Sequence, residues 1–305
     1  MAAGNQAGAA PGNQAAATAA SQAVTAASQT VTAASQHTTA SSPDVRSLTL
    51  VSQVFGNTRS IRVHLPPGYD STEAAGVRYP VLYLNDGFAV FSERSWNAPK
   101  QLDGLVRERS IRPLILIGID NAASIPGAKN PAEDRANEYL PYPDASEPGL
   151  PSPRGRDYPR FLFGEVMPLV ERTFRVDTAQ VALGGSSYGA IAALFASLAA
   201  ERPISALLLE SPPLFLFEER LTGQVQATGR LPRTYIGIGT RETDDPAVLS
   251  KGAAAIDRFV QVAERAGAKV VVNRVEGASH NAAAWRARFP AALKALFGTG
   301  STPGS

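Results

Sequence analysis

The pentapeptide Gly185-Ser186-Ser187-Tyr188-Gly189 has the residue types and the spacing of a nucleophile turn, G-x-S-x-G. An apolar run, Val181-Ala-Leu183, precedes it, and an Ala-rich segment follows. Between a strand and a helix, such a turn needs small flanking residues, lifts the serine hydroxyl clear of the sheet, and places it at a helix N-terminus. Starting the pattern one residue earlier would put Tyr188 at the final glycine. We therefore expect Ser187 to be a nucleophile.

A serine hydroxyl is a weak nucleophile and needs an adjacent base, and the chain has only three histidines. His37 lies in an N-terminal repeat. His64 lies in a β-rich run before the central strands, where we expect a half-exposed strand residue. His280 lies in the loop between the last apolar strand and the last helical segment. Elimination and chain order both favour His280 as the general base.

A carboxylate that orients the base should lie between the nucleophile and the histidine in the chain. The segment after the strand at 235–238 offers Glu242, Asp244 and Asp245. We favour Glu242 because it follows the strand most closely. The two aspartates precede Pro246, a common first helical residue, and are typical of helix caps. The choice among the three stays open at this point.

The negative charge that develops on an attacked carbonyl oxygen needs two backbone N–H donors. One should be the amide of Tyr188, which follows the nucleophile directly. The other should come from the loop after the strand that ends at Leu84, where we expect Phe88, with Gly87 as the alternative.

Strand and helix patterns along the chain predict how these residues are positioned. Two β-rich runs, 48–54 and 60–65, flank Gly56-Asn57 and predict a hairpin. Later runs are apolar throughout, as in a parallel sheet covered on both faces, and helical patterns separate them. The apolar runs lie at 80–84, 113–119, 181–183, 206–209, 235–238 and 270–272, and the helical patterns at 101–109, 158–173, 190–200, 246–266 and 282–297. The order predicts one doubly wound α/β domain with a mostly parallel central sheet, an N-terminal antiparallel hairpin and helices on both faces.

The two ends of the chain differ in composition from the domain. Residues 1–42 contain three copies of a seven-residue Thr-Ala-Ala-Ser-Gln unit with at most one Val each. A stripe this poor in apolar side chains cannot offset the backbone entropy lost on ordering, so we expect a disordered tail. The domain is expected over 43–298, and a flexible tail over 299–305.

Composition excludes several classes of function. The chain has 29 Lys+Arg, 27 Asp+Glu and no Cys. The near balance of charge argues against a nucleic-acid partner, and thiol nucleophiles and Cys-based metal sites are excluded. The histidines are too scattered for a zinc site of known spacing, so we expect no metal or cofactor. The long uncharged N-terminal stretch is too polar for a membrane span or a signal peptide, and localisation and oligomeric state stay open.

Several segments together resemble the putative-esterase family of α/β hydrolases, the group of esterase D, feruloyl and acetylxylan esterases and enterochelin-type siderophore esterases. The similarity extends from about Arg59 to Phe297. The matching segments are Arg62-Val-His-Leu-Pro-Pro-Gly-Tyr69, Tyr79-Pro-Val-Leu-Tyr-Leu-Asn-Asp-Gly87, Gly118-Ile-Asp120, Arg135-Ala-Asn-Glu-Tyr139, Gly184-Gly-Ser-Ser-Tyr-Gly189, Ser211-Pro212 and Gly277-Ala-Ser-His-Asn281 with Trp285. One departure is Ala190, where relatives commonly carry a second glycine.

The resemblance implies an α/β-hydrolase fold and a metal-free serine hydrolase of carboxylic esters that acts on a small-molecule substrate. Acyl transfer to a sugar or another alcohol is the alternative, and a catalytically idle binding module is a third reading. The proline-rich stretch from Asn121 to about Arg156 is long enough to form a rim of the site. Its cations, which would favour a siderophore ester, are Lys129, Arg135, Arg154 and Arg156.

Overall fold

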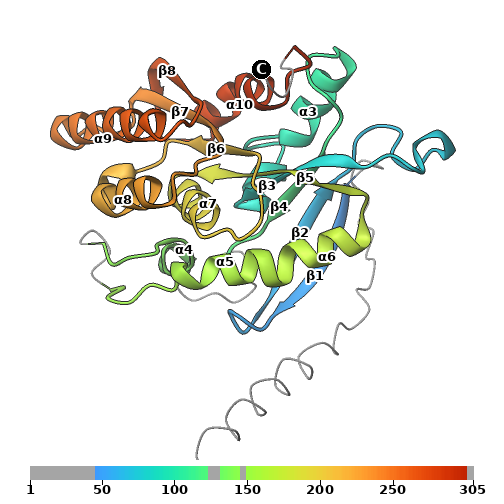
Figure 1. The fold of residues 1–305 in the computed structure, drawn as a ribbon, viewed down its shortest axis with the longest axis horizontal. Coiled ribbons are helices and arrows are strands. Elements are labelled where there is room, and N and C mark those ends of the chain that lie inside the picture. Colours follow the sequence, from blue (N-terminus) through green and yellow to red (C-terminus); the bar gives the residue numbers. More distant parts are fainter. Residues whose placement is uncertain (1–44, 123–130, 145–148, 301–305) are drawn as a thin grey trace, which may run out of the picture. The chain divides into compact units, whose positions relative to one another are not determined.

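A computed structural model describes residues 45–122, 131–144 and 149–300 of the chain. They form an eight-stranded sheet in the order β1-β2-β4-β3-β5-β6-β7-β8 (Figure 1). β1 pairs antiparallel with β2, β2 pairs antiparallel with β4, and every other pairing is parallel. The strands are β1 (Val45–Ser52), β2 (Asn57–His64), β3 (Tyr79–Asn85), β4 (Ile115–Ile119), β5 (Val176–Ser186), β6 (Ala206–Glu210), β7 (Arg233–Arg241) and β8 (Val270–Ser279).

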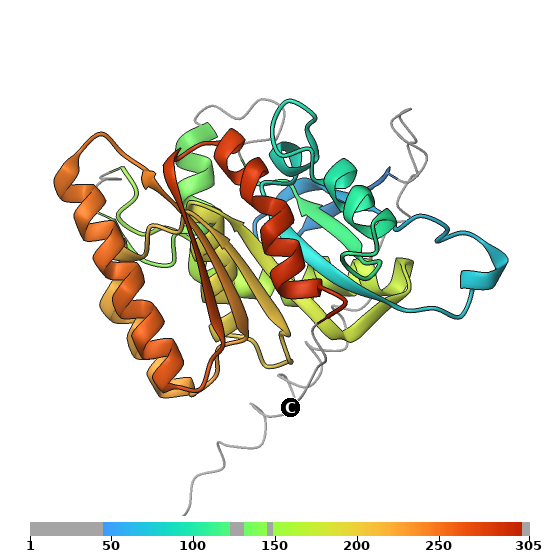
Figure 2. The same ribbon diagram turned by 90° about the horizontal axis from the view of Figure 1, so that it is seen from above.

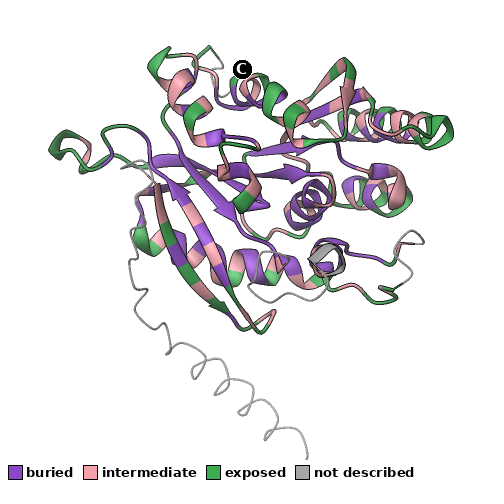
Figure 3. Cartoon of the chain, turned by 180° about the vertical axis from the view of Figure 1, so that it is seen from behind, coloured by how far each residue is buried: buried purple, intermediate pink, exposed green. Residues whose placement is uncertain are grey.

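The central strands are buried on both faces because helices cover both. Along β3, Val81 and Tyr83 join one apolar cluster, while Leu82 and Leu84 join the other. This alternation follows from the two-residue period of a strand. Buried residues accordingly run along the central strands and along α7 (Figure 3).

The helices divide between the two faces of the sheet. Helices α2, α3 and α10 pack over one cluster, and α4 to α9 contribute to the other; α3 and α10 lie on the opposite side of the sheet from α5, α6 and α7 (Figure 1). In the view of Figure 2, α10 crosses the strands and α9 runs along the side of the sheet that ends in β8. Their bounds are α2 (Gly87–Phe91), α3 (Ala98–Arg107), α4 (Pro131–Tyr139), α5 (Tyr158–Phe161), α6 (Met167–Thr173), α7 (Tyr188–Leu198), α8 (Glu218–Thr228), α9 (Pro246–Arg265) and α10 (Ala282–Phe297).

The predicted α/β architecture, with its hairpin and parallel sheet, is confirmed. Three helices were not predicted: α2, α4 and α8. Helix α4 lies inside the proline-rich stretch, 121–156, that was expected to form a rim of the site. The expected N-terminal tail, and all of the C-terminal tail except residues 299 and 300, lie outside the described residues.

The expectation for His64 was wrong. Its side chain is 1% exposed, and its Nε2 lies 2.7 Å from the Asp103 Oδ1 of α3. The reason is that β2 is an inner strand with β1 on one side and β4 on the other, while α3 covers it. His64 is therefore a structural residue remote from the nucleophile turn.

Candidate active site

Ser187 occupies a strained turn between β5 and α7. Its backbone has φ 53° and ψ −128°, a conformation that costs a non-glycine residue free energy and that clusters at functional sites. The Ser187 amide donates to the Glu210 carbonyl at 2.9 Å, which ties the turn to β6. A Cβ at Gly185 would lie 2.7 Å from the backbone of Gly189, so only glycine fits there. The G-x-S-x-G pattern thus has the geometric basis that the sequence predicted.

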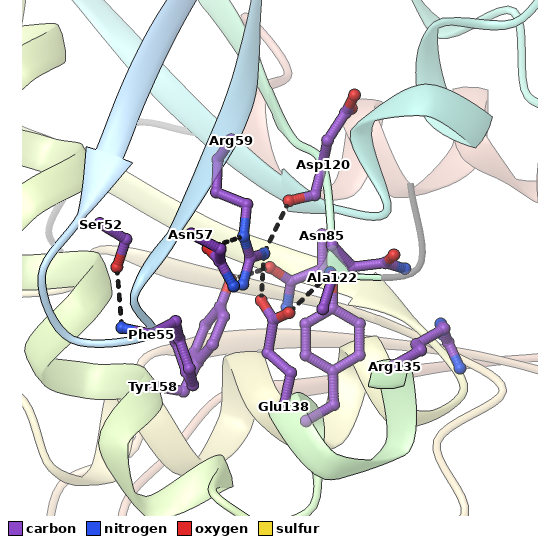
Figure 4. A network of polar contacts seen from close by, with 12 residues as sticks. Ser52, Phe55, Asn57, Arg59, Asn85, Asp120, Ala122, Arg135, Glu138 and Tyr158 are labelled. Carbon is purple, nitrogen blue, oxygen red and sulfur yellow. Dashed lines mark hydrogen bonds and ion pairs between the residues drawn. The ribbon is translucent and has the colours of Figure 1, made fainter. Parts of the chain in front are cut away.

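A polar network that includes Asn85 lies at the end of β3 (Figure 4). Asn85 donates from Nδ2 to the Gly189 carbonyl at 2.7 Å and accepts a hydrogen bond from the Tyr158 hydroxyl. Beside it, a fully buried ion pair joins Arg59 to Glu138 of α4 at 2.9 Å. Burial raises the pKa of the Glu138 carboxyl above its usual value, and Arg59 opposes that rise. The Asn85 contacts tie the end of β3 to the start of α7 and to α5, and the ion pair ties α4 to β2.

His280 follows β8 and faces Glu242. Its Nδ1 lies 2.7 Å from Glu242 Oε2, and its ring packs edge-on against Trp285 with centroids 5.3 Å apart. About a third of the His280 side chain (35%) is exposed, so its other ring nitrogen can reach a substrate site. The structure thus brings together two of the sequence-predicted residues, 38 positions apart, in a base-and-carboxylate pair.

Glu242 is anchored by three donors. Its Oε1 accepts from the Gly239 amide at 2.6 Å and from the Ser211 hydroxyl at 2.8 Å, while Oε2 faces His280. Burial opposes ionisation, but the hydrogen bonds from His280, Gly239 and Ser211 outweigh it and lower the pKa of Glu242. The carboxyl group is therefore held ionised in one orientation.

The other two acidic candidates lie elsewhere. Asp245 caps α9, since its Oδ1 accepts from the amides of Ala247 at 2.8 Å and Val248 at 3.3 Å. That is the capping role the sequence predicted for it. Asp244 is exposed, and it is absent from the lining of the cavity that contains Glu242.

A second layer of charge, which the sequence did not predict, lies under Glu242. Arg288 of α10 donates to Glu210 Oε2 at 2.7 Å and to Ser211 Oγ at 3.0 Å, and Trp285 Nε1 donates to the same hydroxyl at 2.9 Å. Burial raises the pKa of Glu210 to about 7 despite Arg288. The sequence carries one signal of this charge layer, Glu210, which ends the apolar run of β6. A charged side chain at such a buried position needs a buried partner of opposite charge.

The two expected oxyanion donors lie at the ends of β3 and β5. Tyr188 begins α7, whose N-terminus favours negative charge. Phe88 lies in the short helix α2, near the Asp120 carboxylate, and its backbone dipole favours the ionised form of that group. Burial nevertheless raises the pKa of Asp120.

A cavity of about 740 Å³ opens over the site, and Ser187, Tyr188, Glu242 and His280 all contribute to its wall. The remaining lining comes from residues 211–213, 215 and 216 after β6, from residues at and after the end of β7, from Arg274 of β8, and from the part of α9 between Pro246 and Ile256. The cavity therefore joins the three residues Ser187, His280 and Glu242 to a space large enough for a small organic molecule.

The expected rim cations are committed to other partners where the structure describes them. Arg135 forms a two-pronged ion pair with Asp86 at 2.8–2.9 Å and donates to the Ser186 carbonyl. Arg154 pairs with Asp157, and Arg156 donates to a backbone carbonyl and stacks on Tyr142. None of these arginines lines the cavity. Lys129 lies outside the described residues.

Two classes of feature are absent from the described part of the chain. Among residues 45–122, 131–144 and 149–300, no group of three or more His, Asp or Glu side chains is arranged to hold a metal ion. Within the same ranges, no helix is both long enough and apolar enough to cross a membrane.

Comparison with solved structures finds the same fold in several proteins. The siderophore hydrolase EstB from Aspergillus nidulans superposes with a TM-score of 0.68 at 17% identity, covering 88% of this chain and 99% of that one. The BES protein from Bacillus cereus gives 0.67 at 18% identity, with 86% and 98% covered. A ferulic acid esterase gives 0.62 at 21% identity, with 83% and 97% covered. At these identities the likeness shows a shared fold.

A family model with the description "Putative esterase" matches residues 52–296, which include the nucleophile turn, Glu242 and His280. The match covers most of the chain and the whole described sheet from the end of β1 onward. The chain therefore belongs to this esterase family.

Proposed function

We propose that the chain hydrolyses carboxylic esters through an acyl-serine intermediate, with Ser187 as nucleophile, His280 as general base and Glu242 as the carboxylate that orients the base. The observation that carries the proposal is the 2.7 Å contact between His280 Nδ1 and Glu242 Oε2 in the wall of the cavity that also exposes Ser187. A nucleophile, a base and an orienting acid are the three parts that such a mechanism needs.

The reaction has two halves. The Ser187 oxygen forms a bond to the ester carbonyl carbon while His280 Nε2 takes the hydroxyl proton. The tetrahedral intermediate then collapses, the bond to the alcohol oxygen breaks, and His280 returns the proton to the departing alcohol. Water repeats the sequence on the acyl-serine and releases the acid. The Glu242 contact keeps the proton of neutral His280 on Nδ1 and stabilises the imidazolium ion of each half.

Stabilisation of the oxyanion is assigned to the backbone. The Tyr188 amide at the start of α7 is one proposed donor, and the Phe88 amide is the other. Loss of one such donor typically lowers kcat by about 100- to 1000-fold.

Kinetics of two adjacent serine variants test the proposal. Ser187→Ala should lower kcat for a 4-nitrophenyl ester by several orders of magnitude without changing the melting temperature appreciably. Ser186→Ala, the matched control, should retain substantial activity, because its side chain is buried in β5 rather than in the cavity wall. Wild-type kcat in Ser187→Ala would contradict the proposal.

A further inference from the structure

The cavity beside Ser187 has a mostly apolar wall. Apolar side chains dominate it on two sides: Pro212, Pro213 and Leu216 come from the turn after β6, and Val248, Leu249 and Ile256 come from α9. An exposed concave surface of this kind is the usual form of a binding site for an apolar group.

The charged side chains in that wall already have partners. Glu242 is committed to His280 and Ser211, and Arg274 forms an ion pair with Asp257. An anionic substituent entering the cavity would lose its hydration and would have to compete with Asp257 for the Arg274 guanidinium, which is unfavourable. The described rim arginines lie outside the lining.

A glycine in α9 enlarges the cavity. Gly252 is a poor residue for the interior of a long helix, where alanine would be more stable. It lines the cavity next to Phe215, and a Cβ there would already touch the Phe215 ring at 3.6 Å. A longer side chain at this position must enter the cavity or displace the ring.

We infer that this cavity binds an uncharged apolar group of the ester, an alkyl chain or a neutral ring, and that Gly252 sets the length it accepts. The inference rests on the proposed function, since the group must be attached to a carbonyl that Ser187 attacks. The apolar group can belong to the acyl part or to the alcohol part, and the experiment separates these two sources.

Two ester series test the inference. One is 4-nitrophenyl esters from acetate to dodecanoate, and the other is alkyl acetates from ethyl to octyl. In the series whose variable part occupies the cavity, kcat/KM should rise about fourfold for each added methylene until the cavity is filled. The mono-4-nitrophenyl ester of adipic acid, which carries a carboxylate, should react at least about tenfold more slowly than the heptanoate of similar length.

The matched variants are Gly252→Leu and Gly223→Leu. Gly223 lies in α8 and is exposed, and a Cβ added to it would have open space within 4 Å. Leucine at position 223 should therefore leave the dependence of kcat/KM on ester chain length unchanged. Gly252→Leu should lower the ratio of kcat/KM for the optimal long ester to that for acetate by at least about tenfold.

A flat profile in both series, a preference for the adipate, or equal losses on short and long esters in Gly252→Leu would overturn the inference. An enzyme with a flat profile that still cleaves acetate esters would keep the proposed function. Failure to cleave any ester would overturn both.

Discussion

Replacing Arg288 by leucine tests the buried charge layer beneath Glu242. The Arg288 side chain is 2% exposed, and that of its partner Glu210 is 0% exposed, with 2.7 Å between Nε and Oε2. Breaking a buried pair by removing one partner costs about 3–5 kcal/mol, because the other charge is left uncompensated. This cost in the free energy of unfolding applies at pH values at which Glu210 is ionised.

The cost should depend on pH, and its sign follows from Glu210. Its pKa in the folded protein, about 7, lies above the ordinary value of 4.5, so the folded state holds a proton that the unfolded state releases. In the wild type, the contribution of Glu210 to the free energy of unfolding therefore falls as pH rises from about 4.5 to about 7, and then levels off. Without Arg288 the folded pKa is higher still, and the fall continues above pH 7 by up to about 1.4 kcal/mol per pH unit.

Urea unfolding at pH 5, 7 and 9, followed by the fluorescence of Trp96 and Trp285, measures this difference. Arg288→Leu should be destabilised least at pH 5 and most at pH 9. Adding Glu210→Gln to the variant should remove the extra pH dependence, since the amide does not titrate. A loss of the same size at pH 5 and pH 9 would refute the reasoning.

Four further outcomes are expected. Glu242→Gln should lower kcat by orders of magnitude with little change in KM, whereas Asp244→Asn should keep kcat. A large loss of kcat in Asp244→Asn instead would identify Asp244 as the acid that orients His280. No large loss in either variant would indicate a mechanism with Ser187 and His280 alone. Asp245→Asn should keep kcat and change stability by no more than about 0.5–2 kcal/mol, measured by thermal melting, because the side chain only caps α9. Deleting residues 1–42 should leave melting temperature and kcat nearly unchanged, because their sequence has no apolar stripe to dock, and a drop of more than a few degrees would contradict this. EDTA should not affect ester hydrolysis, and activity lost to EDTA and restored by added metal would count against a serine mechanism.

Local patterns predicted most of the fold. Apolar runs and the Gly56-Asn57 turn located the strands, because a strand buried on both faces must be apolar throughout. Helices α2, α4 and α8 escaped because they are short or lack a strong apolar stripe, and packing against neighbours stabilises them. His64 was misjudged because its burial depends on α3, which the sequence does not place beside β2.

In the candidate site, too, some residues could be proposed from local sequence patterns and others depend on the packing of distant elements. Ser187 was proposed as the nucleophile from a turn motif, and His280 as the base from elimination. Glu242 was proposed from chain order, and its Oε2 lies 2.7 Å from His280 Nδ1. Ser211 and Arg288 could not be found alone, since their contacts with Glu242 and Glu210 exist only once β6, β7 and α10 are packed together.

A fluorophosphonate probe tests the central claim most directly, because it forms a covalent bond only with an activated serine. After labelling of the active full-length chain, peptide mass spectrometry should place the whole label on Ser187, with loss of esterase activity in proportion to labelling. Ser187→Ala should take up no label. Labelling at Ser186, or unlabelled Ser187 in enzyme that still cleaves esters, would contradict the account.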